Sequence, residues 1–176
     1  MEVQLTMFRF LILPLIAFFL TLFQSGLISE LLPNFVKPDL MLILITYLGA
    51  SPLLVTGAIL VFFCGLLQET FSGSPQGLFL VIYLSIFFFI KLLGKFLILG
   101  DAVTLRIILV AVSITLQVFL MVFLPPALGI FFNLSLPGLS WILPQALMTC
   151  AVGWPLFHLL KKLEALPRVE PSPLEP

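Results

Sequence analysis

Long apolar runs follow one another along most of the chain, and they constrain its fold more than any other feature. Residues 53–64 and 78–90, for example, contain no charged residue. Of the 176 residues, 61% are hydrophobic and 9% are charged, whereas soluble domains carry about 25% charged residues. This number of charges is too small to cover a surface that faces water. We therefore expect an integral membrane protein.

Residues suited to the N-cap of a helix precede five of these runs. Their side-chain oxygens satisfy backbone N–H groups that lipid cannot satisfy. Pro52 and Pro75 follow two of them, at the first helical position, where a missing N–H is tolerated. With the first run, residues 7–24, they predict an all-α integral membrane protein with a bundle of six transmembrane helices. The five N-cap residues are Asp39, Ser51, Ser74, Asp101 and Ser140.

The second predicted helix, residues 40–50, is short for a membrane span. At 1.5 Å per residue it reaches about 16 Å, while the hydrocarbon core is about 30 Å thick. It either begins earlier, within residues 27–36, or ends at a turn inside the membrane among neighbouring helices. A third arrangement fuses residues 39–67 into one kinked span and gives five helices.

Basic residues indicate how the helices are oriented. With six spans and a cytoplasmic N-terminus, seven of the eight basic residues face the cytoplasm and only Lys37 lies outside, as the positive-inside rule favours. The five-span arrangement, with an external N-terminus, satisfies the rule equally well and stays open here. Residues 1–162 form the predicted polytopic domain, and residues 163–176, with four prolines, a disordered cytoplasmic tail.

The segment GLLQETFSGSPQG, residues 65–77, interrupts the apolar runs. Glu69 falls at a predicted helix C-terminus, where the helix dipole opposes a carboxylate, whereas Asp39 falls at an N-terminus, where the dipole favours one. We interpret the segment as a structural turn whose carboxylate either contacts a partner or reaches interfacial water. The candidate interface or structural residues of both turns are Pro38, Asp39, Gln68, Glu69, Gly73, Ser74 and Gly77.

Polar or small residues also recur at helical spacing within three of the apolar runs. In lipid, small residues allow helices to approach closely and amides form hydrogen bonds between helices. We therefore interpret these faces as packing surfaces of the bundle or of a partner. The sets are Ser113 with Gln117, Gln145 with Thr149, and Gly57 with Cys64 and Gln68.

No catalytic constellation is evident in the sequence. An intramembrane serine protease needs serine and histidine within hydrogen-bond reach, but Ser72 and Ser74 are predicted near one membrane face and His158 near the other. No residues have metal-ligand spacing, no loop resembles a phosphate-binding loop, and no basic segment interleaved with aromatics supports nucleic-acid binding. We therefore predict that the protein is not an enzyme and has no catalytic, metal or cofactor-binding residues.

Two stretches, KPDLMLILITYLGASP (37–52) and GAILVFFCGLLQETFSGSPQGLFLVIYLSIFF (57–88), together resemble the MreD family of bacterial rod shape-determining membrane proteins. That family has a basic-Pro-Asp step before an apolar helix and a proline that begins the next. A Gly-Leu-Leu-x-acid-x-x-x-Gly-Ser-x-x-Gly turn then follows. Glu69 stands where the family more often has aspartate. The residues that match are Lys37, Pro38, Asp39, Gly65, Leu66, Leu67, Glu69, Gly73, Ser74 and Gly77.

The resemblance implies a non-enzymatic scaffold or regulatory component of the bacterial cell-elongation (rod) complex. Such a protein lies in the cell inner membrane and supports cell shape and lateral peptidoglycan synthesis. Besides membrane lipid, its implied partner is an MreC-type protein, and through it the actin-like MreB and the RodA/penicillin-binding-protein synthase. No cofactor is implied.

The alternative is the substrate-binding membrane subunit of an energy-coupling-factor vitamin transporter, which is also a small six-helix protein. Such subunits typically carry an Ala-x-x-x-Ala docking motif on an early helix, and the first three runs have none. Their pockets hold several polar side chains, and the apolar runs of this chain supply few.

Overall fold

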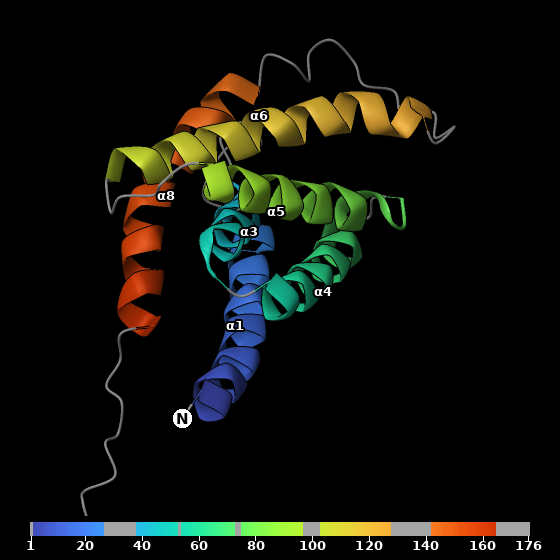
Figure 1. Cartoon of the computed structure of the whole chain (residues 1–176). Coiled ribbons are helices and arrows are strands. Elements are labelled where there is room, and N and C mark those ends of the chain that lie inside the picture. The colour runs from blue at the N-terminus through green and yellow to red at the C-terminus, as the bar shows by residue number, and fades with distance from the viewer. Residues whose placement is uncertain are drawn as a thin grey trace, which may run out of the picture.

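The computed structural model describes residues 2–26, 38–52, 54–72, 75–96, 103–127 and 142–164. Every regular element in these ranges is an α-helix (Figure 1), so the all-α prediction is confirmed for this part of the chain. Each predicted run contains one helix. The helices are α1 (Glu2–Ser25), α3 (Leu40–Ala50), α4 (Leu54–Ser72), α5 (Leu78–Phe96), α6 (Val103–Ala127) and α8 (Ile142–Glu164).

The short helix α3 lies at the centre of the fold. It contacts each of the other five described helices, and nine of its 11 residues are buried. A helix that is apolar on all sides is expected to be buried on all sides. Because protein surrounds α3, its length need not match the thickness of a membrane.

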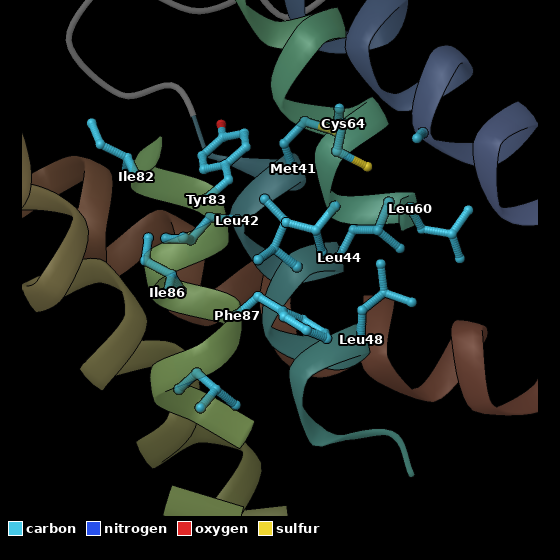
Figure 2. Packing of buried hydrophobic residues seen from close by; sticks show 14 of the residues in the cluster. Met41, Leu42, Leu44, Leu48, Leu60, Cys64, Ile82, Tyr83, Ile86 and Phe87 are labelled. Carbon is cyan, nitrogen blue, oxygen red and sulfur yellow. The ribbon is translucent and has the colours of Figure 1, made fainter. Parts of the chain in front are cut away.

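Helices α3 and α4 are two separate antiparallel helices rather than one kinked helix. Met41, near the start of α3, lies beside Cys64 in the second half of α4 (Figure 2). Near the end of α3, the carbonyl oxygen of Leu48 is 3.7 Å from the place that a Cβ on Gly57 would occupy, near the start of α4. The chain therefore turns back on itself after residue 50.

Helices α6 and α8 also alternate in direction relative to α3. Helix α6 runs antiparallel to α3, because Asp39 hydrogen-bonds Gln117 and Thr46 hydrogen-bonds Ser113. Helix α8 runs parallel to α3, since the Tyr47 and Phe157 rings meet at one end and residues 39 and 149 meet at the other. Figure 1 shows the N-terminal end of α1 and the C-terminal end of α8 on the same side of the molecule.

The largest apolar core joins α3, α4 and α5. Tyr83 and Phe87 of α5 are fully buried and lie among side chains of α3 and α4, including Leu42 and Leu44 (Figure 2). The Phe87 ring also lies over Gly57, where an added Cβ would be 2.9 Å from ring carbons. A missing side chain on α4 thus makes room for an aromatic ring on α5.

Two predicted helix starts differ from the structure. Ser51 is the C-cap of α3: its hydroxyl donates to the carbonyl of Leu48 at 2.8 Å, and α4 begins only at Leu54. Helix α5 begins at Leu78, after a turn that contains Pro75. In both places the serine or proline serves the turn before the helix. The other predicted caps, Ser74, Asp101 and Ser140, lie outside the described residues.

Two of the described helices are long and apolar enough to cross a membrane, Leu54–Ser72 and Ile108–Pro126. Large apolar side chains are exposed on every described helix except α3, including Phe19 at 61%, Val55 at 70% and Leu147 at 66%. Exposed apolar surface of this extent is typical of proteins that meet lipid or other proteins.

Candidate functional site

Asp39 is the centre of a buried polar cluster at the N-terminus of α3. Its side chain is 5% exposed. One carboxylate oxygen, Oδ1, accepts a hydrogen bond from the backbone N–H of Leu42 at 3.0 Å, the expected N-cap interaction. The other, Oδ2, accepts from Nε2 of Gln117 at 2.9 Å. One side chain therefore caps α3 and connects it to α6.

Helices α1 and α8 complete the cluster. The backbone N–H of Asp39 donates to Thr149 Oγ1 on α8 at 3.0 Å, and the N–H of Leu40 donates to Gln24 Oε1 on α1 at 3.2 Å. The first N–H groups of a helix have no partner within the helix. Here side chains from two other helices supply those partners, as a buried helix end requires.

Two of the polar pairs noted in the sequence face α3. Gln117 contacts Asp39, and one turn away Ser113 Oγ lies 2.8 Å from Thr46 Oγ1. On α8, the Thr149 hydroxyl donates to the carbonyl of Gln145 at 2.8 Å and accepts from Asp39. These faces pack the bundle, as the helical spacing of their residues predicted. The identity of their common partner, Asp39, carried no signal in the sequence.

A cavity of about 230 Å³ adjoins the cluster between α3, α6 and α8. Its polar lining includes Asp39, Gln117 and Thr149, and the remaining wall is largely apolar. Gln117 is 8% exposed, and its Oε1 atom has no hydrogen-bond partner among the described residues. A buried, unpaired amide oxygen is uncommon in a native structure and calls for an explanation.

The second predicted motif forms a different contact, between α4 and α5. Glu69 Oε1 accepts a hydrogen bond from the backbone N–H of Leu80, in the first turn of α5, at 2.9 Å. One helical turn earlier on α4, Gly65 is so close to α5 that an added Cβ would lie 2.8 Å from the Leu80 Cα. Glycine allows the close approach, and the acid four residues later caps the next helix, where the dipole favours a carboxylate.

The turn between these helices depends on Gly77. The N–H of Leu78 donates to the carbonyl of Pro75 at 3.3 Å, and Gly77 has a φ of 87°. A positive φ at the third position of a four-residue turn favours glycine. Pro38 is buried beside Asp39 and Gln68 is partly buried on α4, whereas the predicted Gly73 and Ser74 lie outside the described residues.

The alternating directions place the two motifs at the same end of the bundle. Asp39 precedes α3, and Glu69 lies near the C-terminal end of the antiparallel α4. Their carboxylates nevertheless have different partners, Gln117 for Asp39 and Leu80 for Glu69. The structure thus separates them into two sites.

We expect Glu69→Gln to lower stability only modestly. The glutamine oxygen still accepts from the Leu80 N–H, so the expected loss is the interaction of the negative charge with the N-terminus of α5, about 0.3–1 kcal/mol. The free energy of unfolding, measured by denaturant titration in uncharged detergent micelles, tests this. A loss above about 2 kcal/mol would show that the charge has a further partner.

The described serine, histidine and cysteine residues that a catalytic or metal site could use do not lie together. His158 is exposed in the C-terminal half of α8, and Ser72 is exposed at the C-terminal end of α4. Cys64 and Cys150 are free thiols. No group of three or more histidine, cysteine, aspartate or glutamate side chains among the described residues is placed to hold a metal ion.

Comparison of the chain with protein-family models, curated proteins and solved structures finds no match.

Proposed function

We propose that this protein is a non-enzymatic scaffold or regulatory component of the bacterial cell-elongation complex in the inner membrane. The observation that supports the proposal most is the α4–α5 unit formed by Gly65, Glu69 and Gly77. These residues belong to the motif that resembles the MreD family, and each helps to position α4 against α5: Gly65 by close approach, Glu69 by a hydrogen bond and Gly77 by its positive φ. A motif that fixes the relative position of two helices suits a scaffold protein, because a scaffold binds its partners through a surface of fixed shape.

The proposal includes six membrane-spanning segments with both termini in the cytoplasm. In the alternating arrangement, the ends of the helices nearest Asp39 and Glu69 face outward. The opposite ends hold the basic residues of the described helices, which the positive-inside rule assigns to the cytoplasm. These residues are Arg9, Lys91, Lys95, Arg106, Lys161 and Lys162.

A complementation experiment tests the scaffold role. In a rod-shaped bacterium depleted of its own MreD-type protein, expression of this chain is expected to restore rod shape. An affinity-tagged copy is expected to copurify an MreC-type partner. The control is an unrelated six-helix membrane protein at matched expression. If the chain inserts at normal levels in several such hosts, yet restores neither shape nor copurification, the scaffold proposal is wrong.

The cavity beside Asp39 favours a second candidate, the substrate-binding subunit of a vitamin transporter. It supplies a pocket with several polar side chains at one end, which the apolar sequence does not suggest. Copurification with a transporter ATPase module, together with vitamin uptake by cells that express both, distinguishes this role from the scaffold role.

A further inference from the structure

The cavity between α3, α6 and α8 is lined at its polar end by the Asp39 carboxylate and by Gln117, whose buried Oε1 atom has no donor among the described residues. We infer that it is a binding site for a primary ammonium group carried on a small apolar body. The inference rests on the cavity alone and does not depend on the scaffold role.

Asp39 places a carboxyl group at the polar end of the cavity. The two side-chain hydrogen bonds to the Asp39 carboxylate come from neutral donors, the Leu42 N–H and the Gln117 amide. A carboxylate has about four acceptor positions, so further donors can be accommodated. Buried charges in proteins are normally paired. A cation that enters the cavity would pair with the ionised form of the Asp39 side chain.

The side-chain oxygen of Gln117 is unpaired among the described residues. The amide nitrogen is used by Asp39, which leaves Oε1 as a buried acceptor without a partner among the described residues. Both Gln117 and Asp39 line the cavity. An ammonium group has three N–H donors, enough to bind the carboxylate and the amide oxygen together.

The rest of the cavity has the size and the apolar lining that suit a short alkyl chain. An apolar cavity of ~150 Å³ holds benzene, so 230 Å³ accommodates a short alkyl chain. An anion would be repelled by Asp39, and the largely apolar wall suits an alkyl body better than a hydrated metal ion. The apolar wall residues are Leu42, Ile114, Val118, Met121, Val122 and Ala146.

Two sources can supply this chemistry, the ethanolamine headgroup of a lipid or a free alkylamine. Thermal unfolding of the full chain in dodecyl maltoside tests both. We expect hexylammonium chloride to raise the unfolding temperature. Tetramethylammonium chloride, which has no N–H donor, and sodium chloride at equal ionic strength are expected to have little effect. Phosphatidylethanolamine is expected to stabilise more than phosphatidylglycerol if the source is lipid.

Three variants complete the experiment. Asp39→Asn is expected to weaken hexylammonium binding at least tenfold, because a charge-assisted hydrogen bond is lost. Ala146→Leu fills the cavity without changing the carboxylate and is expected to weaken binding similarly. Glu69→Gln also removes one negative charge but lies outside the cavity, so its binding should equal that of the parent.

Two results would overturn the inference. The first is that neither hexylammonium nor phosphatidylethanolamine stabilises the parent protein more than its matched control. The second is that binding persists unchanged in both Asp39→Asn and Ala146→Leu. Circular dichroism and the unfolding temperature of each variant without ligand show that it is folded, so loss of binding can be attributed to the cavity.

Discussion

Gly65→Ala is expected to lower the free energy of unfolding by about 2–3 kcal/mol, at the upper part of the range for overpacked helix contacts. The added Cβ would lie 2.8 Å from the Leu80 Cα, which belongs to the backbone of α5 and cannot rotate away. The two helices must therefore separate along their contact. Separation also lengthens the hydrogen bond between Glu69 and the Leu80 N–H. The measurement is denaturant titration in detergent micelles, followed by circular dichroism.

Gly153→Ala on α8 is the matched control. There an added Cβ would meet its nearest atoms, in the Val110 side chain, at 3.6 Å, an ordinary contact distance. Alanine also favours the helix over glycine by roughly 0.5–1 kcal/mol, so stability is expected to stay level or rise slightly. If Gly65→Ala is as stable as Gly153→Ala, the close approach of α4 and α5 is not required for the fold.

Asp39→Ala is expected to cost about 2–4 kcal/mol of unfolding free energy. Loss of the N-cap accounts for about 1 kcal/mol, and leaving the buried Gln117 amide without its acceptor adds about 1–3 kcal/mol. Asp39→Asn should cost much less. Asparagine also caps helices well, and a rotated Gln117 amide can accept from the new Nδ2 donor.

The comparison of these two variants separates the hydrogen bonds of Asp39 from its charge. Unfolding free energies of both, measured under the same detergent conditions, are expected to place Asn close to the parent and Ala well below it. Equal losses in Asn and Ala would mean that the negative charge, rather than the hydrogen bonds, holds α3 to α6. Equal stability of Ala and the parent would exclude Asp39 as an anchor of the bundle.

Local features of the fold followed from the sequence. The apolar runs predicted the helices, and Asp39 was correctly predicted to cap a helix over residues 40–50. These features depend on neighbouring residues. The starts of α4 and α5 were predicted too early, because a serine or proline suits a turn as well as a helix start, and only the surrounding contacts decide between them.

The partners of the two carboxylates did not follow from the sequence. Gln117 is 78 residues from Asp39 along the chain, and no local pattern encodes such a contact. Glu69 lies at the end of its own helix, where the dipole is unfavourable for a carboxylate. Its stabilising contact is with the N-terminus of the next helix, where the dipole is favourable. Gly65 and Glu69 are one helical turn apart, so the spacing places them on the same face of α4. To predict their contacts from it, one must also know that α5 packs against that face.

The central position of α3 has a consequence for how the chain is made. An 11-residue helix is too short to remain in a bilayer by itself, so it depends on segments that flank it. Gln24, which binds the Leu40 N–H, is synthesised before α3, but the two other side chains of the cluster come later: Gln117 follows Asp39 by 78 residues and Thr149 by 110. The ribosome must therefore produce most of the protein before the contacts of α3 are complete. Packing of α8 against α3 is then the last of these contacts to form.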